Sequence, residues 1–272
     1  MLYVVATPIG NLADASPRSI ETLRSADLVA CEDTRTTRTL LAHYGIAVRT
    51  VALHEHNERK AAKGLVEALR QGKNVALVSD AGTPALADPG AFLVSEAHRA
   101  GIRVSPLPGP SAAAAAISAS GFAASRFLFA GFLPAKAGER RKALEALDLP
   151  WPVVLYEAPH RIREALADML ARFGAQREVV LARELSKKFE EVARLPLGEA
   201  PAWLDQRPQR EQGEFVLVLA PGEERPPESV DAERVLDVLL EALAPSEAAK
   251  LAARITGRPK AELYRKAMER AK

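Results

Sequence analysis

The sequence is nearly devoid of cysteine, and this scarcity excludes several kinds of site. Cys31 is the single cysteine among 272 residues, so the chain can form neither an internal disulfide nor a cysteine-based zinc site. Such cysteine usage is typical of proteins kept in a reducing compartment. We therefore predict a cytoplasmic protein.

Long hydrophobic runs are also missing. No window approaches the roughly 18 unbroken apolar residues that a membrane-spanning helix needs. The N-terminal stretch MLYVVATPIGN has no basic region before its short apolar segment, unlike a secretory signal peptide. We predict a soluble protein that is neither exported nor associated with a membrane.

The common short motifs for nucleotides, metals and activated serine are absent. There is no GxxxxGK[ST] phosphate loop, and TPIGN (7–11) lacks the GxGxxG pattern, which disfavours ATP, GTP and NAD as ligands. No GxSxG nucleophile motif occurs. HEHNE (54–58) does not match HExxH, and histidines two residues apart do not share a helical face. We predict no metal site and interpret these histidines as polar loop residues or a substrate contact.

A strong net charge is missing as well. The chain carries 37 basic and 35 acidic residues, a formal charge of +2, so any attraction to nucleic acid must come from the distribution of charge. A hydrophobic content of 48% and a charged content of 26% are ordinary for a globular protein. The length allows one large or two modest domains, and we predict two.

Short β-branched runs alternate with amphipathic segments along the chain. The runs are apolar without interruption, as expected for strands covered on both faces. They are LYVVA (2–6), LVAC (28–31), VALVS (75–79), VVLYE (153–157), VVLA (179–182) and FVLVLA (215–220). This alternation predicts an α/β fold with mostly parallel sheets, in which ligands bind beyond the carboxyl ends of the strands.

Local signals mark the ends of two predicted helices. Ser16 followed by Pro17 is typical of a helix start, because serine caps the free amides and proline at the first position loses no bond. In AAKGLVEALRQG (61–72), Leu65 and Leu69 share one helical face and Gly72 stands where a helix is expected to end.

Three loops that follow strand-like runs are rich in glycine and proline; the run before the third loop is IRVS (102–105). They are ATPIGN (6–11), SDAGTPALADPG (79–90) and SPLPGPSAAAAA (105–116). Glycine lets a ligand approach the backbone, proline stiffens the loop, and a helix starting near Ser111 points free amides outward. The three loops together predict a preformed, backbone-lined pocket; the alternative is that each merely turns the chain.

A series of motifs in fixed order resembles a known family. The motifs are TPIGNLAD (7–14), CEDTRTTRTLL (31–41), HEHNE (54–58), VSDAGTPALADPG (78–90), PLPGPSA (106–112), GFLP (131–134) and YEAPHR (156–161). Over roughly residues 1–220 they resemble the ribosomal RNA small subunit methyltransferase I family, within the tetrapyrrole methylase group. The resemblance implies a two-domain α/β fold that binds S-adenosyl-L-methionine in the cleft between domains, and a homodimer.

The resemblance also implies an activity and a set of cofactor-binding residues. The activity is 2′-O-methylation of a cytidine in the decoding region of small-subunit ribosomal RNA, either free or in the assembled small subunit. The cofactor-binding residues lie in the loops and in YEAPHR. They are Pro8, Gly10, Asp80, Gly82, Thr83, Leu86, Ser111, Ala112, Tyr156 and Ala158. The broader group often has Gly-Asp-Pro where this sequence has Gly82-Thr83-Pro84. This difference leaves open which polar contact the loop makes with the cofactor. It also favours the members of the group that methylate ribosomal RNA over those that methylate tetrapyrroles.

Methyl transfer to a ribose hydroxyl needs alignment and a proton acceptor. Candidate acceptors are Glu32, Asp33, His54 and Glu157, and Arg35 is a candidate for holding a phosphate. The other interpretation of EDTR (32–35) is a helix N-terminus capped by Asp33 or Thr34.

The C-terminal part differs in character from the rest. GEERPPESVD (222–231) is typical of a linker, and Ser246 precedes a helix, glycine turn, helix pattern typical of a helix-turn-helix. From Lys250 to Lys272, eight basic residues stand against Glu262 and Glu269. They indicate either a solvated face or contact with RNA phosphates, and the same two interpretations apply to Lys187 and Lys188.

The resulting domain prediction has three parts. Residues 1–118 and 119–224 form two α/β domains, and residues 225–272 form a small basic helical extension. Two other functions stay open: a methyltransferase of the same fold acting on a tetrapyrrole or a protein side chain, and a non-catalytic RNA-binding protein.

Overall fold

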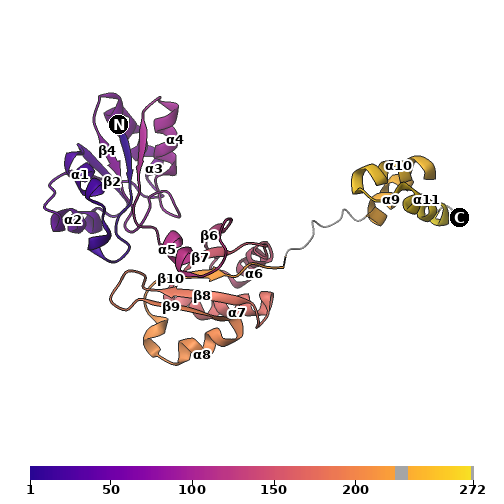
Figure 1. The fold of residues 1–272 in the computed structure, drawn as a ribbon. Helices are drawn as coiled ribbons and strands as arrows, with labels where there is room; N and C mark the ends of the chain where they lie inside the picture. Colours follow the sequence, from indigo (N-terminus) through magenta and orange to yellow (C-terminus); the bar gives the residue numbers. More distant parts are fainter. Residues whose placement is uncertain (224–231, 271–272) are drawn as a thin grey trace. The chain divides into compact units, whose positions relative to one another are not determined.

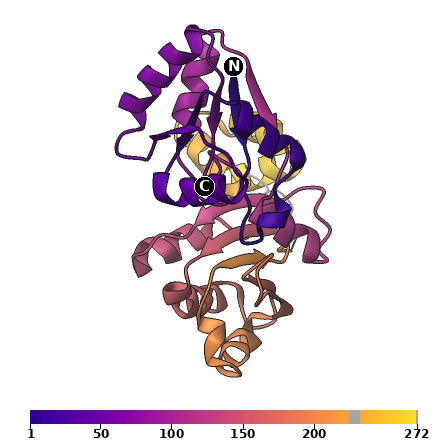
Figure 2. The same ribbon diagram turned by 90° about the vertical axis from the view of Figure 1, so that its left-hand side faces the viewer.

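The structure is a computed structural model that describes residues 1–223 and 232–270. Its contacts divide the chain into two compact units, Met1–Gly222 and Glu223–Lys272. Most of the linker predicted at 222–231, and the predicted boundary at residue 225, lie outside the described residues. The larger unit contains two sheets, which lie one above the other in both views (Figures 1 and 2).

The first sheet has five parallel strands in the order β3-β2-β4-β1-β5. Its elements are β1 (Leu2–Val5), α1 (Pro17–Ser25), β2 (Leu28–Cys31), α2 (Thr34–His43), β3 (Arg49–Ala52), α3 (Glu58–Arg70), β4 (Val75–Leu77), α4 (Ala91–Arg99) and β5 (Val104–Leu107). Helices α3 and α4 cover one face and α1 and α2 the other, which explains the uninterrupted apolar runs. The predicted α/β fold is confirmed.

The helix boundaries follow the predicted signals. Ser16 caps α1 by accepting a hydrogen bond from the Ser19 amide, and Pro17 is its first residue. Helix α3 ends at Arg70, and Gly72 follows in the left-handed region with φ 87°. The run VALVS forms a shorter strand than predicted, because β4 ends at Leu77 and Val78 and Ser79 already belong to the buried start of the loop.

The second sheet has the order β6-β7-β10-β8-β9. Its elements are α5 (Ala112–Ala119), β6 (Leu128–Phe132), α6 (Ala137–Glu145), β7 (Val153–Glu157), α7 (Ile162–Phe173), β8 (Glu178–Arg183), β9 (Glu191–Pro196), α8 (Ala200–Asp205) and β10 (Phe215–Leu219). Only β6 and β7 pair in parallel among these described strands. The prediction of mostly parallel sheets is therefore wrong here, because β8 and β9 form a hairpin and β10 inserts antiparallel between β7 and β8.

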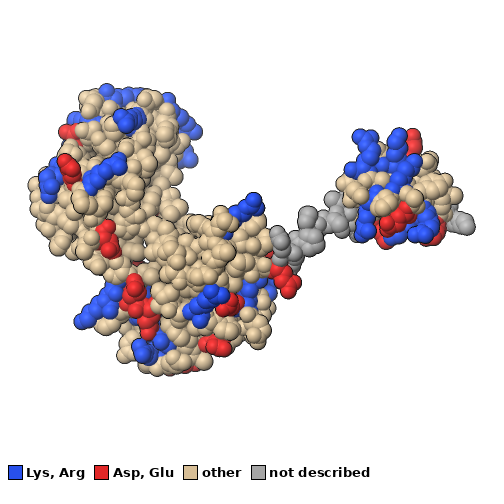
Figure 3. All heavy atoms as spheres, in the orientation of Figure 1, with Lys and Arg blue, Asp and Glu red and all other residues tan. Residues whose placement is uncertain are grey.

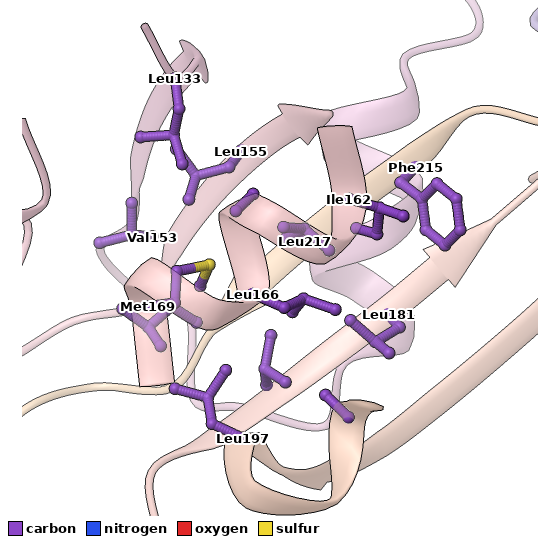
Figure 4. Close-up of a cluster of buried hydrophobic side chains, with 14 of the residues drawn as sticks. Leu133, Val153, Leu155, Ile162, Leu166, Met169, Leu181, Leu197, Phe215 and Leu217 are labelled. Carbon is purple, nitrogen blue, oxygen red and sulfur yellow. The ribbon is translucent and has the colours of Figure 1, made fainter. Parts of the chain in front are cut away.

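The two faces of the second sheet have different covers. Helices α6, α7 and α8 cover the apolar core around Leu155, Leu166 and Leu181 (Figure 4). Helix α5 covers the opposite face, where Ala116 and Ile117 pack on Val154 and Val218. Because α5 follows directly from the loop after β5, this helix links the first sheet to the second.

The C-terminal unit is helical in its described part. It contains α9 (Ala232–Leu240), α10 (Pro245–Thr256) and α11 (Lys260–Arg270), packed around Leu236, Ala249 and Leu263. Gly257, with φ 69°, makes the left-handed turn after α10 and confirms the predicted helix, glycine turn, helix pattern. Ser246 was predicted to precede this helix, but the helix begins at Pro245, so Ser246 is its second residue, and no side chain caps it. Among the described residues, no helix has the length and apolar content to cross a membrane.

Candidate functional site

The three glycine- and proline-rich loops are neighbours in space. They follow β4, β1 and β5, which are adjacent strands of the first sheet and end at the same edge. Thr7 and Gly82 exchange two backbone hydrogen bonds of 2.9 and 3.0 Å, which join the first two loops. The Thr83 hydroxyl donates to the Pro110 carbonyl over 3.1 Å and joins the third. The loops therefore form one connected surface rather than three separate turns.

Close backbone approach shapes this surface at Gly109. A Cβ atom at this position would lie 2.8 Å from the Cβ of Ala6, so the loop after β5 can touch the end of β1 only with glycine here. The loop after β4 also has a strained backbone on both sides of Leu86, because Ala85 and Ala87 have positive φ angles of 63° and 65°. The side chain of Leu86 is left partly exposed between them.

A cavity of about 430 Å³ lies against these loops, within the usual size of a small-molecule site. The second sheet supplies the rest of its wall, from the ends of β6, β7 and β8 and the start of β10. The lining residues are Ile9, Asp80, Ala81, Gly82, Thr83, Leu86, Ala87, Asp88, Ala112, Phe132, Tyr156, Glu157, Ala158, Pro159, His160, Ala182, Leu185, Glu214, Phe215 and Val216.

Most of the predicted cofactor-binding residues lie on this wall. Those that line the cavity are Asp80, Gly82, Thr83, Leu86, Ala112, Tyr156 and Ala158. Pro8 and Gly10 flank the lining residue Ile9, and Ser111 caps α5 immediately before the lining residue Ala112. The structure thus brings the predicted set together, and its contact with a cofactor stays a prediction.

Carboxylates gather where β2 and β4 end. We call Glu32, Asp80 and Asp88 the acidic cluster; Asp80 and Asp88 line the cavity. Burial and the charge of Glu32 raise the pKa of Asp88 to about 6. Burial and the charge of Asp80 likewise raise the pKa of Glu32, while His54 opposes this rise. Asp80 is exposed and Glu32 and Asp88 are partly buried, so three neighbouring negative charges make this wall suited to a positively charged ligand.

Asp33 has a structural role at the start of α2. It caps the helix by accepting a 2.7 Å hydrogen bond from the Arg35 amide, and its carboxylate pairs with the Arg35 guanidinium at 2.9 Å. These hydrogen bonds lower the pKa of Asp33 to about 2, which makes it a weak proton acceptor. The interpretation of EDTR as a capped helix start is confirmed, and catalytic roles for Asp33 and Arg35 stay predictions.

The HEHNE segment positions a loop of the cavity. Asn57 accepts a hydrogen bond from the His54 amide over 2.9 Å and donates to the Ala52 carbonyl, which shapes the turn before α3. The Glu58 carboxylate accepts from the Gly90 and Phe92 amides over 2.8 and 3.1 Å, so it fixes the far end of the loop that carries Asp88. Within residues 1–223 and 232–270, no cluster of histidine, cysteine and carboxylate side chains has the arrangement of a metal site.

Glu157 lies in the opposite wall, at the end of β7. Its side chain is buried, and one of its oxygens accepts a hydrogen bond from the Ala158 amide and lies 3.3 Å from the Arg161 guanidinium. Burial raises the pKa of Glu157 despite this partner. Arg161 also donates to the carbonyls of Leu133 and Pro134. The pair therefore fixes the segment that follows β6.

The hairpin loop between β8 and β9 closes one side of the cavity. The Lys187 ammonium group donates hydrogen bonds to the carboxylates of Glu184 and Glu214 over 2.8 and 3.0 Å. The aliphatic part of its side chain occupies the space that a Cβ at Gly10 would need. The Ser186 hydroxyl donates to Asp14 across the same junction. The basic segment thus lies in the hairpin of β8 and β9, and an RNA contact by Lys187 or Lys188 stays a prediction.

Several residues that line the cavity were not predicted from the sequence. Asp88 lies inside a quoted motif, but a separation of eight residues from Asp80 does not indicate that both side chains reach one cavity. Phe132 in GFLP and His160 in YEAPHR also lie within quoted motifs. Ile9, Leu185 and Val216 carry no local signal, because apolar side chains of the wall resemble those of the core.

The fold and this cavity define a tetrapyrrole methylase. Residues 1–201 match the family described as Tetrapyrrole (Corrin/Porphyrin) Methylases. Solved structures of similar fold include a diphthine synthase (TM-score 0.60, 19% identity, covering 80% of this chain and 89% of that one). A cobalt precorrin-4 methyltransferase is also similar (TM-score 0.58, 15% identity, covering 80% and 94%). At such identities the likeness concerns the fold alone.

More similar sequences narrow the assignment. Ribosomal RNA small subunit methyltransferase I of Pseudomonas aeruginosa is 50% identical, covering 99% of this chain and 97% of the relative. The protein of the same name from Escherichia coli O157:H7 is 48% identical, covering 98% and 94%. Residues 226–271 match the family described as RsmI C-terminal HTH domain. The chain belongs to the ribosomal RNA small subunit methyltransferase I family, as its motifs predict.

Proposed function

We propose that this protein transfers a methyl group from S-adenosyl-L-methionine to the ribose 2′-oxygen of a cytidine in the decoding region of small-subunit ribosomal RNA. Membership of the family supports methyl transfer to ribosomal RNA. The observation that carries the proposal is one cavity whose wall combines Asp80 and Asp88 of the acidic cluster with apolar and backbone-lined surfaces.

The residues of the cavity fit the cofactor. Asp80 and Asp88 line the cavity and form no ion pair in the described structure, and burial and the charge of Glu32 raise the pKa of Asp88, so a positively charged ligand would be stabilised there. Leu86, Tyr156 and Val216 offer apolar surface for a nucleoside. When bound, S-adenosyl-L-methionine supplies a methyl group already activated by its sulfonium sulfur.

The protein then has two tasks: to hold the cofactor and the ribose in line, and to accept the proton of the ribose hydroxyl. Rigid loops that hold two reactants in line can lower a barrier by about 7–11 kcal/mol. The ribose hydroxyl is a weak acid, so a carboxylate with a raised pKa is better suited to take its proton than one with a lowered pKa. Burial raises the pKa of Glu32, Asp88 and Glu157, so we assign this task to one of these three carboxylates rather than to Asp33.

We further propose that the C-terminal unit contributes to RNA binding and that two copies of the chain associate, in the cytoplasm, where the small subunit is made. Lys and Arg side chains cover much of the face of the C-terminal unit drawn in Figure 3. Within the described structure, Lys250, Arg254, Arg258, Lys260 and Arg265 form no ion pair, so their charges are available to phosphates.

The test is a transfer assay with S-adenosyl-L-methionine labelled in its methyl group. Purified protein is incubated with naked ribosomal RNA, with small subunits lacking the modification, and with neither. We expect label in a ribose of one cytidine, recovered by nuclease digestion. Label in the protein alone would indicate a protein methyltransferase. RNA binding without cofactor binding would leave only a non-catalytic RNA-binding role.

A further inference from the structure

Phe132 is a large aromatic residue that the fold leaves in solvent. It is the last residue of β6, it lines the cavity, and its exposed fraction is 55%. Other apolar residues of the same wall, such as Ala182 and Val216, are buried. An apolar ring held open at the rim of a cavity is an unusual use of a residue that normally adds to the core.

A bulge in β6 places the ring there. In the parallel pairing of β6 with β7, Phe129 is opposite Val154 and Gly131 is opposite Leu155, so Ala130 is an extra residue. Gly131 adopts the left-handed region with φ 65° at this point. Phe132 is consequently opposite Tyr156 and faces the cavity; simple alternation from Phe129 would put it on the face of the α6, α7 and α8 core.

The ring is also held in place. It contacts Tyr156 edge to face, with ring centroids 5.6 Å apart, and Tyr156 is itself held by Phe129 at 4.9 Å. The next residue, Leu133, is buried in the core, and Arg161 binds its carbonyl. A fixed aromatic face needs little ordering when a flat partner binds to it.

We infer that Phe132 stacks on a nucleobase of the RNA substrate and so helps to position the ribose that is methylated. The inference rests on the proposed function. Bases of single-stranded RNA bind protein chiefly by stacking on exposed aromatic rings. An RNA base is favoured over the adenine of the cofactor because the ring is more than half exposed at the rim, whereas the buried wall of Ala182 and Val216 suits the smaller ligand.

The experiment compares Phe132→Ala, Phe132→Leu and Phe132→Tyr with the wild type. Phe127→Ala is the matched control, since Phe127 is 44% exposed, lies just before β6 and is not part of the cavity wall. Methyl transfer gives kcat and KM for the RNA, and calorimetry gives Kd for S-adenosylhomocysteine. Because Phe132 is exposed, all variants are expected to keep the wild-type melting temperature.

We expect Phe132→Ala to lower kcat/KM for the RNA by about 5- to 150-fold, the usual range for one lost stacking contact. Phe132→Tyr should retain most of the activity, Phe132→Leu should be intermediate, and Phe127→Ala should match the wild type. The Kd for S-adenosylhomocysteine should stay within about twofold of the wild-type value in all variants.

Two results would overturn the inference alone, given an active wild type: unchanged RNA kinetics in Phe132→Ala, or a loss of S-adenosylhomocysteine affinity as large as the loss in kcat/KM. The second result would assign the ring to the cofactor's adenine. A wild-type protein that transfers no label to RNA would overturn the proposed function together with this inference.

Discussion

Gly109 brings the loop after β5 into direct contact with the end of β1. An alanine Cβ would lie 2.8 Å from the Cβ of Ala6, in the two loops that lead into the cavity wall at Ile9 and Ala112. We expect Gly109→Ala to lower the free energy of unfolding by about 1–3 kcal/mol, as overpacking usually does. We also expect weaker binding of S-adenosylhomocysteine. Urea unfolding and calorimetry measure the two effects.

Gly64 provides the matched control for this substitution. It lies inside α3, and a Cβ there would meet no atom within 4 Å. Gly64→Ala should raise the free energy of unfolding by about 0.5–1 kcal/mol because alanine favours the helix. If Gly109→Ala were as well tolerated as Gly64→Ala, close packing of the loop would not shape the cavity.

Asp88 gives the cavity a pH dependence. With a pKa of about 6, its carboxyl is mostly neutral at pH 5 and mostly ionised at pH 7. A cationic ligand favours the ionised form, so its affinity should rise as the pH rises through about 6 and level off above 7.

Comparison of two ligands isolates this effect. S-adenosyl-L-methionine carries a sulfonium charge that S-adenosylhomocysteine lacks, so the ratio of their affinities should increase between pH 5 and 7. Calorimetry across this range measures the ratio. Asp88→Asn should make it independent of pH, and a flat wild-type ratio would remove Asp88 from recognition of the cation.

At the scale of elements, α10 and α11 form the basic surface of the C-terminal unit. Arg254, Lys260 and Arg265 form no ion pair within the described structure, and Arg254 and Lys260 lie on either side of the Gly257 turn. Replacing all three with glutamine should lower RNA affinity at low salt. The slope of log K against log salt should also fall by about 2–3, since each phosphate contact contributes about 0.7–0.9.

Lys266 is the control for this element. Its ammonium group pairs with Glu233 on α9 and with Glu262, so its charge already has protein partners. Lys266→Gln should leave the salt slope near the wild-type value. An equal change of slope per removed charge in the two variants would mean that the measurement reports net charge rather than contacts made by the helix-turn-helix.

The elements also show which strands can be predicted from a sequence. Continuous apolar runs identified β1, β2, β7 and β10, because a strand covered on both faces has no polar positions. β3 and β9 were missed, since each is an edge strand with exposed or half-exposed residues such as Arg49 and Val192. The antiparallel pairing of β10 was also missed, because strand direction depends on connections that apolar runs do not reveal.

In the candidate site, too, some parts could be predicted from the sequence and others could not. Glycine and proline marked the loops after β1, β4 and β5, because turns and close approach demand those residues. Phe132 was not predicted, since its direction depends on the bulge at Ala130 and Gly131, and a bulge arises from pairing between strands.

At the scale of the whole molecule, the cavity and the basic helices belong to different compact units. Every residue of the cavity wall lies within Met1–Gly222, and the described C-terminal helices have their own apolar core around Leu236 and Leu263. A chain that ends at Gly222 should therefore fold and bind S-adenosylhomocysteine with the wild-type Kd. Circular dichroism and calorimetry test both points.

The same truncated chain should bind RNA more weakly. We expect a loss of about tenfold or more at low salt that shrinks as salt increases, because the lost contacts are with phosphates. Filter binding across a salt series measures it. Wild-type affinity at every salt concentration would show that the C-terminal unit takes no part in RNA binding.

The place of β1 in the first sheet affects how the chain is made. β1 pairs with β4 on one side and with β5 on the other, and the last of these strands is synthesised roughly 100 residues later. At ordinary rates of translation, β1 waits on the order of 5–20 s for its second neighbour. During that time its unpaired backbone N–H and C=O groups and its apolar side chains are open to wrong partners, so a nascent chain stalled before β5 is a natural client for chaperones.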